Sequence, residues 1–276
     1  MTIVFVSDYY AEDFTGGAEL TTKALIESTE QHVIKLYSHQ VDYYILNLYK
    51  EFKWVITNFS RMKHEVKLFF AKNISYSIIE YDYKFCKYRS LDLHKESTGK
   101  ECDCKDDINN IFYGYAEMIW FMSEKQRDIF LSNVWTIKKE KTKILSSCFE
   151  EAHLNLFSNF KIYKKEHYCI LDSNSRIKNT IGCVEYAKDN NLNFKLLKNL
   201  SYDNMLLALA ESKGLIFLPL GADTCPRITI EAKLLDCQLV LNDNVQHKDE
   251  SWFSSRESIL DYLNTNKKLF WKFYDR

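Results

Sequence analysis

Short apolar segments of strand length alternate with longer amphipathic segments along most of this 276-residue chain. In the first half we predict strands at residues 3–6, 33–36, 54–57, 75–79, 118–122 and 142–145. Helices are expected between them, at residues 18–27, 61–71 and 123–130. An order of strand, helix and strand is typical of parallel strands joined by helical crossovers. The sequence therefore predicts an α/β fold with a doubly wound parallel sheet.

The same pattern begins again after a polar and charged stretch at residues 151–165. Strands are predicted at residues 168–171, 194–197, 215–218 and 238–241, and helices at 177–188, 203–211, 228–235 and 254–274. We therefore predict two Rossmann-like domains, residues 1–155 and 156–276, whose parallel sheets face each other across a cleft. In such folds ligands bind at the carboxyl ends of the strands and between domains.

The composition argues against several classes of protein. The 37 basic residues balance 38 acidic ones, so no global polyanion-binding surface is indicated, although a local basic patch stays open. No run of about 18 apolar residues occurs, so no membrane span is expected. Residues 1–6 are predicted to be a first strand and not a signal peptide, because they lack a basic segment and a long apolar run. Eight cysteines without a secretion signal indicate the cytoplasm, where cysteines are thiols or metal ligands.

Residues 215–235 carry the most informative motif, an apolar strand that runs into a turn and then a helix. Asp223 and Glu231 are separated by seven residues, and each carboxylate can accept two hydrogen bonds from sugar hydroxyls. The backbone amides of Thr224 and Cys225, at a helix N-terminus, can meet a phosphate, and Arg227 can add a further contact. The segment indicates a nucleotide-sugar site; the alternative is a surface acid beside an ordinary amphipathic helix.

Two further segments follow predicted strands and carry groups suited to phosphate. Gly16 and Gly17 open the first helix, where glycines permit positive φ and close approach of a ligand to the backbone. Arg176 and Lys178 follow the strand at 168–171 and suit a pyrophosphate. The alternative for Gly16 and Gly17 is a flexible loop. The alternative for Arg176 and Lys178 is a pair of ordinary exposed cations.

Cysteine and histidine gather in an insertion at residues 84–107. Cys86, His94, Cys102 and Cys104 could form a closed tetrahedral zinc site that orders a segment without its own core. The alternative is a set of free thiols in a loop, since the spacing is not a standard C-x-x-C pair. The remaining five cysteines lie in or near predicted core elements and are expected to be buried.

These motifs resemble those of GT-B glycosyltransferases, in particular the large retaining family four. That family opens with a strand, a polar loop, Gly-Gly and a helix, as residues 4–19 do here, and its second domain begins with a strand followed by an Arg and a Lys. Its signature, an acid, seven residues and Glu-Ala, is matched by Asp223 and Glu231-Ala232, with Asp in place of the usual first Glu. The Asp-Thr-Cys-Pro-Arg loop is similar to that of phage-encoded members.

The resemblance implies that Glu231 binds the nucleotide ribose and that Asp223 binds hydroxyls of the donor sugar. The diphosphate would be held by Arg176, Lys178 and the backbone amides of two loops, the one with Gly16 and Gly17 and the one with Asp223. It further implies transfer of a sugar from a nucleoside diphosphate, with UDP favoured, to a hydroxyl acceptor with retention of configuration. In this family the last helix often packs back on the first, acceptor-side domain.

Besides the Asp at position 223, the chain departs from the family pattern at two places. Residues 146–149 replace the usual Pro-Asn-Gly turn, and Glu80-Tyr-Asp82-Tyr83 stands where a His is often found. Glu80 and Asp82 are therefore candidates for a base or for a charge that stabilises the transition state, or else simply a polar strand end. No Asp-x-Asp occurs, so we predict donor binding without a metal ion or other cofactor.

Three other functions stay open at this point. A DNA glycosyltransferase acting on a hydroxylated base would need a basic groove, for which residues 138–143 and 161–165 are candidate strips. A nucleotide-sugar-binding protein without catalysis is the second. The third is an α/β protein of another kind in which the Asp223–Glu231 match is coincidental.

Overall fold

The computed structural model describes residues 2–104, 106–159 and 165–275. The chain forms two compact units. Unit 1 comprises Met1–Glu150 and Thr265–Arg276, and unit 2 comprises Glu151–Asn264. Each unit is an α/β layer structure of its own, as the repeated alternation of strands and helices predicts.

Unit 1 is built on a six-stranded sheet in which every pair of neighbours is parallel, in the order β2-β1-β3-β4-β5-β6. Its strands are β1 (Thr2–Ser7), β2 (His32–Tyr37), β3 (Lys53–Ile56), β4 (Tyr76–Glu80), β5 (Met118–Phe121) and β6 (Thr142–Ile144). Val4, Phe5 and Val6 have no exposed surface, because helices cover both faces of the sheet. Burial on both faces explains why these strands read as continuous apolar runs.

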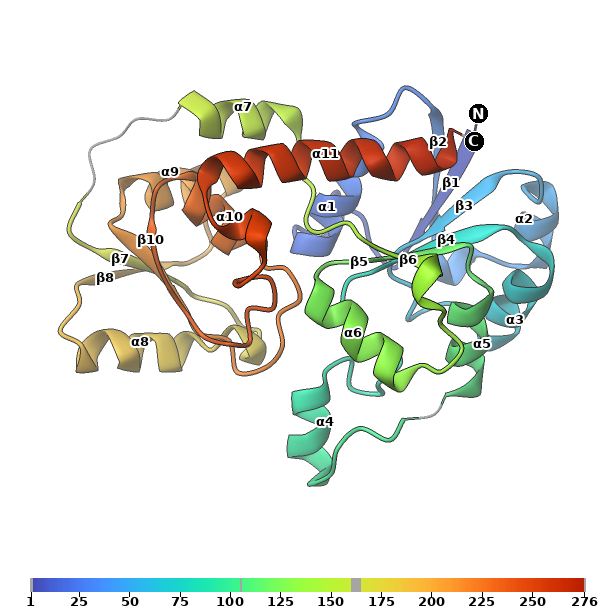
Figure 1. Ribbon diagram of the computed structural model, residues 1–276, viewed down its shortest axis with the longest axis horizontal. Helices are drawn as coiled ribbons and strands as arrows, with labels where there is room; N and C mark the ends of the chain where they lie inside the picture. Colours follow the sequence, from blue (N-terminus) through green and yellow to red (C-terminus); the bar gives the residue numbers. More distant parts are fainter. Residues whose placement is uncertain (1, 105, 160–164, 276) are drawn as a thin grey trace. The chain divides into compact units, whose positions relative to one another are not determined.

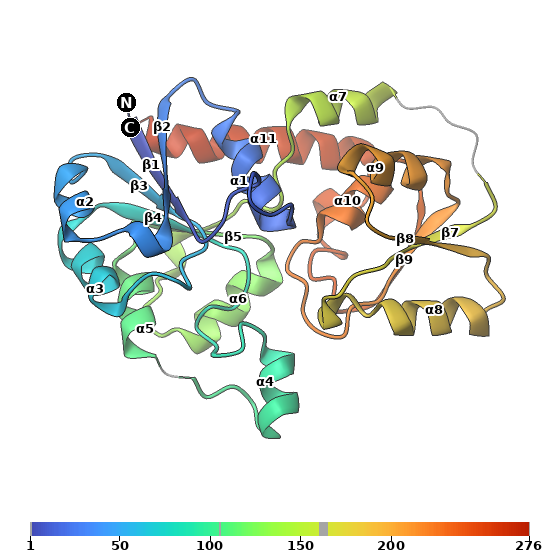
Figure 2. The same cartoon turned by 180° about the vertical axis from the view of Figure 1, so that it is seen from behind.

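The helices of unit 1 lie in two layers (Figures 1 and 2). On one face lie α1 and the C-terminal part of α11, and on the other lie α3, α5 and α6. The helices are α1 (Gly17–Ile26), α2 (Tyr43–Leu48), α3 (His64–Asn73), α4 (Leu91–Thr98), α5 (Asp107–Tyr115) and α6 (Glu124–Asn133), with short 3-10 turns at Ser38–Gln40 and Lys139–Lys141.

Unit 2 has a four-stranded parallel sheet in the order β10-β9-β7-β8. The helices α9 and α10 lie on one face and α8 on the other (Figure 1). The elements are α7 (Glu151–Asn159), β7 (Tyr168–Leu171), a 3-10 turn at Arg176–Lys178, α8 (Thr180–Asp189), β8 (Phe194–Leu197), α9 (Tyr202–Glu211), β9 (Gly214–Phe217), α10 (Arg227–Leu234), β10 (Gln238–Leu241), a 3-10 turn at Ser251–Phe253 and α11 (Arg256–Tyr274). Its core gathers apolar side chains from both sheet and helix, namely Tyr168, Ile170, Cys183, Ala187 and Ile216.

Four short helices, α2, α4, α5 and α7, are not among the helices that the sequence pattern predicts. They are only six to nine residues long, and side-chain caps mark the start of α2, α4 and α5. In α4 the Ser90 hydroxyl accepts a hydrogen bond from Leu93 N, and Gly99 closes the helix with a φ of 70°. In α5 the Asp106 carboxylate caps two backbone amides. Capping residues of this kind also occur in turns, which is why the sequence alone does not separate the two.

All eight cysteines lie in the described ranges, and none of them forms a disulfide. Cys148, Cys169, Cys183, Cys225 and Cys237 are buried, as expected for small core residues. Among the helices of the described ranges, none is both long enough and apolar enough to cross a lipid bilayer.

The C-terminal turns of α11 complete the core of unit 1 with aromatic rings. Phe270 has no exposed surface, and its ring lies 5.1 Å from that of Trp120 on β5. Trp271 packs 6.0 Å from Phe5 on β1, and its indole nitrogen donates a hydrogen bond of 2.9 Å to Ser28 Oγ. Phe270 and Trp271 are therefore part of the hydrophobic core around the N-terminal sheet.

We expect Phe270→Ala to lower the free energy of unfolding by about 3–5 kcal/mol, because it leaves a cavity among buried rings. Leu269→Ala is the matched control, since Leu269 sits on the same helix with 43% of its surface exposed. Urea unfolding of both variants checks the prediction. Equal losses of stability in the two variants would contradict this packing.

Candidate functional site

Three loops of unit 2 leave neighbouring parallel strands at the same edge of the sheet and bind one another through backbone hydrogen bonds. The loop after β9 donates from Leu220 N to Ile177 O, in the loop after β7, at 2.9 Å. It also pairs with the loop after β10, through Asp223 N to Asn244 O at 2.8 Å and Gln246 N to Asp223 O at 3.1 Å. The backbone around Asp223 is thereby held from both sides.

An ion pair joins two of the predicted site residues within this group of loops. Lys178 Nζ lies 2.5 Å from Asp223 Oδ2, and the side chains are 29% and 13% exposed. The structure thus brings Lys178 and Asp223 together at the carboxyl edge of the sheet. Arg176, two residues earlier on the same 3-10 turn, is exposed.

The turn that carries Lys178 ends in a left-handed residue, Asn179, with a φ of 52°. Its side chain accepts a hydrogen bond from Gly182 N at 3.2 Å and donates one to Leu218 O at 2.8 Å. The first contact caps α8, and the second ties the turn to the end of β9. A Cβ on Gly182 would lie 2.5 Å from Asn179 Nδ2, so a larger residue at this position would displace the capping side chain.

The N-terminus of α10 follows directly, with Pro226 as its N-cap and Thr224 and Cys225 buried just before it. Thr229 Oγ1 donates to Pro226 O at 2.8 Å and lies 3.2 Å from His247 Nε2. His247 is fully buried, with its ring stacked on Trp252 at 5.3 Å. Burial lowers the pKa of His247 to about 3, so this imidazole supports the first turn of α10 in its neutral form.

Glu231, one turn further along α10, is a carboxylate with almost no exposed surface. Tyr202 Oη donates a hydrogen bond to Glu231 Oε1 at 2.8 Å, and Arg227 Nε lies 3.5 Å from the same oxygen. Burial raises the pKa of Glu231, while the charge of Arg227 and the Tyr202 hydroxyl oppose that shift. The Arg227 side chain is thus directed at Glu231 and Tyr202 and is itself 7% exposed.

Tyr202 is the residue of this group that the sequence motifs do not indicate. It is the first residue of α9, after the N-cap Ser201, and so belongs to the loop that leaves β8 at the same sheet edge. His153 of α7 packs its ring against Tyr202 at 4.8 Å. In the sequence, Tyr202 is marked only by its place at the start of a helix that follows a strand. Its separation from Asp223 and Glu231 along the chain matches no known motif.

In unit 1 the Gly16-Gly17 pair opens α1 without using the left-handed conformation. Gly16 has a φ of −110°. This glycine therefore leaves room for neighbouring side chains and is not needed for a positive φ. A Cβ there would lie 2.4 Å from Glu19 Oε2 and 2.8 Å from the Phe14 ring. Glu19 itself is buried in the first turn of α1, and burial raises the pKa of its carboxyl group.

Glu80 and Asp82, at the end of β4, differ sharply in their surroundings. Glu80 has no exposed surface; it accepts hydrogen bonds from Lys84 Nζ at 2.7 Å and from the Tyr113 hydroxyl. Burial raises the pKa of Glu80 to about 7. Asp82 is 26% exposed and pairs with Lys84 at 3.2 Å and with Arg89. For Asp82 burial acts to raise the pKa, but the charges of Lys84 and Arg89 outweigh it and lower the pKa.

A pocket of about 480 Å³ in unit 1 lies beside these carboxylates. Cations supply much of its lining, together with the ring of Phe59, whose centroid lies 5.1 Å from Lys67 Nζ and 5.5 Å from Lys84 Nζ. Its other lining residues are Ser60, His64, Phe85, Cys86, Lys87, Arg89, Cys104, Asp106 and Asn109. Cys86 and Cys104 belong to a cluster with His94 and Cys102 that could hold a metal ion.

The fold is similar to that of proteins solved with nucleotide sugars, although no family model and no curated protein matches the sequence. The Anabaena protein Alr3699/HepE, solved with UDP and glucose, has a TM-score of 0.60 at 11% identity, over 100% of this chain and 99% of that one. Its complex with UDP-glucose gives 0.56 at 12% identity, over 96% and 89%.

A third structure is an alpha-glucosyltransferase in complex with UDP and a 13-mer DNA containing an HMU base. Its TM-score is 0.52 at 8% identity, over 96% of this chain and 90% of the other. These similarities confirm the predicted fold class, an α/β protein of GT-B type with two parallel sheets.

The neutral, buried His247 makes the stability of the protein depend on pH. Its folded pKa lies below the ordinary value near 6.5, so the unfolded chain binds a proton first as pH falls. This contribution to stability is complete above pH 6.5 and is lost progressively as pH falls toward 3. Relative to His247→Gln, we expect the wild type to lose up to about 1.4 kcal/mol per pH unit in that window.

Urea unfolding at pH 7, 6 and 5 measures this difference, with His39→Gln, at an exposed position, as the control. Parallel stability curves for wild type and His247→Gln would contradict a buried neutral imidazole.

Proposed function

We propose that this protein is a glycosyltransferase that takes a sugar from a UDP-sugar donor and passes it to a hydroxyl acceptor. The observation that carries the proposal is the arrangement in unit 2. Asp223 with Lys178, and Glu231 with Tyr202, come from the loops and the helices that follow the strands at one edge of a parallel sheet. This edge is where α/β folds bind nucleotides.

In this proposal Glu231 binds the ribose hydroxyls of UDP. Its carboxylate has four lone-pair sites and receives one hydroxyl from Tyr202 in the structure, so a diol can replace or join that donor. Because Tyr202 and Arg227 cover Glu231, nucleotide binding requires the Tyr202 side chain to move. UDP is the nucleotide chosen because the structures with the same fold contain UDP or UDP-glucose.

The diphosphate is then placed against the backbone amides of Thr224 and Cys225, with Lys178 and Arg176 supplying positive charge. Lys178 already faces Asp223, which in turn binds hydroxyls of the donor sugar. The chain has no Asp-x-Asp motif, so the proposal uses no metal ion in donor binding.

During transfer, the bond between the anomeric carbon and the β-phosphate oxygen breaks, and its electron pair leaves with UDP. The acceptor oxygen forms the new bond to the anomeric carbon and gives up its proton to a base. Lys178 and the helix N-terminus stabilise the charge that develops on the diphosphate. On the acceptor side, the partly exposed Asp82 is better suited than the fully buried Glu80 to contact a substrate.

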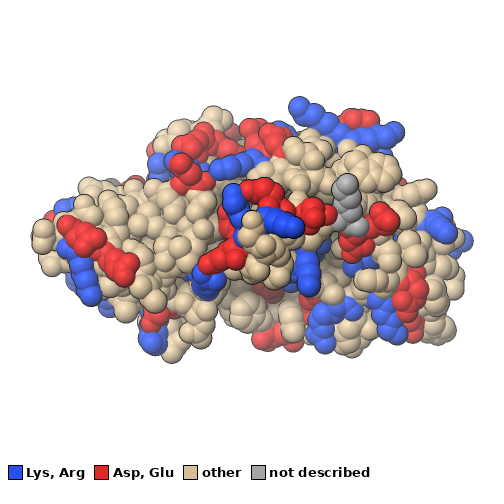
Figure 3. All heavy atoms as spheres, turned by 90° about the horizontal axis from the view of Figure 1, so that it is seen from below, with Lys and Arg blue, Asp and Glu red and all other residues tan. Residues whose placement is uncertain are grey.

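We propose a carbohydrate or other small hydroxyl compound as the acceptor, with a hydroxylated base in nucleic acid as the alternative. On the face shown in Figure 3, acidic and basic side chains of the described residues are interspersed. Within residues 138–143, Lys141 donates to Ala116 O at 3.2 Å and Lys143 lies over the Trp120 ring at 5.7 Å. Of the other candidate strip, residues 161–164 lie outside the described part of the chain, and Lys165 pairs with Glu211.

UDP should raise the melting temperature of the wild-type protein, since a ligand at 100 times its Kd stabilises the native state by about 2.7 kcal/mol. Glu231→Gln keeps the size of the side chain but removes its charge, and we expect it to abolish most of this shift. Glu185→Gln, on the exposed side of α8, is the matched control and should respond like the wild type. Thermal shift assays with UDP, GDP and ADP measure the effect and its base selectivity.

An unchanged UDP shift in Glu231→Gln would contradict the assignment of the ribose site. The absence of a shift with every nucleotide, in wild type and control alike, would contradict the proposed function as a whole.

Asp223→Asn should leave the UDP shift in place and lower the rate of sugar release or transfer by roughly 10- to 100-fold. The reason is that it weakens a hydrogen bond to a charged group, which contributes about 1.5–3 kcal/mol. Production of UDP from UDP-glucose, UDP-galactose and UDP-N-acetylglucosamine is the measurement, and Asp189→Asn is the control at an exposed position of the same unit. Tight UDP binding without UDP-sugar turnover in the wild type, across a broad acceptor panel, would instead favour a nucleotide-sugar-binding protein.

A further inference from the structure

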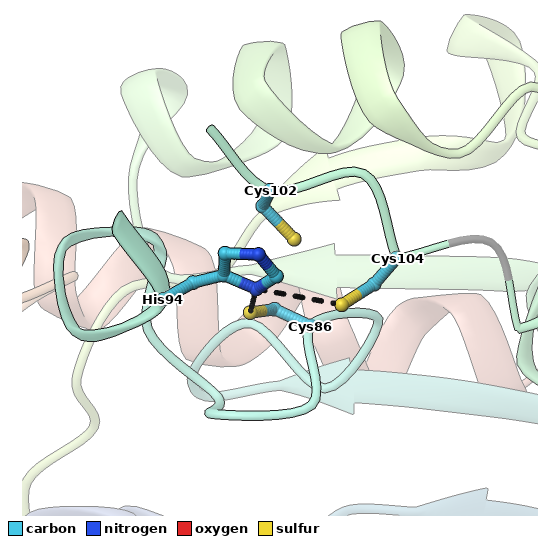
Figure 4. A group of neighbouring side chains, drawn as sticks. All are labelled: Cys86, His94, Cys102 and Cys104. Carbon is cyan, nitrogen blue, oxygen red and sulfur yellow. Dashed lines mark hydrogen bonds between the residues drawn. The ribbon is translucent and has the colours of Figure 1, made fainter. Parts of the chain in front are cut away.

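Four side chains that are far from the donor site in sequence converge in unit 1 (Figure 4). Cys86 precedes α4, His94 lies on α4, and Cys102 and Cys104 follow it. Their ligand atoms all lie within 4.8 Å of one another. Cys86 and His94 are buried, whereas Cys102 and Cys104 are partly exposed.

Two of the six distances among these atoms match the edges of a zinc tetrahedron. With Zn–S of about 2.3 Å and Zn–N of about 2.0–2.1 Å at tetrahedral angles, sulfur and nitrogen ligands lie roughly 3.6 Å apart. His94 Nδ1 is 3.6 Å from Cys86 Sγ and 3.5 Å from Cys104 Sγ. These two distances from nitrogen to sulfur therefore have the values expected of ligands that share one ion.

The helix that carries His94 buries few side chains. In α4, His94 is the single buried residue, and the other seven positions are exposed or half-buried. An eight-residue helix with one buried side chain is not stable by hydrophobic packing alone. A bound metal provides the missing centre, because the free energy of metal binding becomes free energy of folding.

Neighbouring groups contact two of the four ligands. Lys87 N donates to Cys104 Sγ at 3.4 Å, a contact that fixes the position of this sulfur. On the other side of the ring, His94 Nε2 lies 3.9 Å from Asp103 Oδ1, within reach of the carboxylate contact that often orients a zinc-bound histidine. The Tyr88 ring packs edge-on against His94 at 5.4 Å.

We propose that Cys86, His94, Cys102 and Cys104 bind a structural zinc ion through three thiolates and His94 Nδ1. Soft sulfur ligands with one imidazole select zinc over calcium or magnesium, and four protein ligands fill a tetrahedral shell. No position stays open for water or substrate, so the ion is structural and not catalytic. Binding releases the protons of the three thiols.

The site also shapes the pocket of unit 1. Cys86 and Cys104 are lining residues of the 480 Å³ pocket, alongside Lys84, Lys87 and Arg89. Zinc therefore fixes the wall that carries these cations. All four ligands belong to unit 1, so this inference stands independently of the donor site in unit 2.

The test is the metal content of full-length protein purified without added zinc, measured by plasma mass spectrometry. We expect close to one equivalent of zinc in the wild type and a loss of most of it in Cys104→Ser and Cys102→Ser. Cys148→Ser, a buried thiol of the same unit outside the cluster, is the matched control and should keep its zinc. Less than about half an equivalent in the wild type, or full retention in both ligand variants, would overturn the proposal.

A second measurement does not depend on whether the variants fold. Wild-type protein stripped with a chelator and titrated with Co²⁺ should show the visible absorption of tetrahedral cobalt with thiolate ligands, saturating at one equivalent. Chelation should also lower the melting temperature of the wild type by several degrees, with full recovery on adding Zn²⁺. Absence of the cobalt spectrum, or a disulfide among these cysteines in freshly purified protein, would contradict the zinc site.

Discussion

The parallel direction of all four strands in unit 2 is the constraint on which the candidate site depends. Parallel strands end at the same edge, so the loops after β7, β8, β9 and β10 are brought together although they are far apart in sequence. Backbone hydrogen bonds then lock the loop of Asp223 between its neighbours. The acidic loop, the basic turn of Lys178 and the N-terminus of α10 acquire their positions from this one arrangement.

In each unit a buried carboxylate is accompanied by a tyrosine hydroxyl and a cation. Glu231 is accompanied by Tyr202 and Arg227, and Glu80 by Tyr113 and Lys84. A carboxylate without such partners would be strongly destabilised in the interior. In unit 1 the arrangement leaves Glu80 with no exposed surface, which fits a structural role. In unit 2 the proposed function requires Tyr202, the tyrosine that covers Glu231, to move.

Much of this architecture could be predicted from the sequence, because strands buried on both faces read as apolar runs. The bounds of β7, β8 and β10 agree residue for residue with those expected, and α6 begins one residue after the predicted start at residue 123. Tyr202 and His247 could not be predicted as neighbours of α10, since each reaches it from another loop and carries no spacing signal. Short helices such as α4 were not predicted because eight residues give few repeats of the helical pattern, and capping residues also occur in turns.

The central claim is that Glu231 is the ribose ligand of a bound nucleotide, and a crystal structure of the complex with UDP tests it most directly. The account predicts ribose hydroxyls within hydrogen-bond distance of the Glu231 carboxylate, Tyr202 displaced from its present contact, and the diphosphate at the amides of Thr224 and Cys225 near Lys178. UDP bound with its ribose elsewhere, and with the contact between Tyr202 and Glu231 intact, would contradict it.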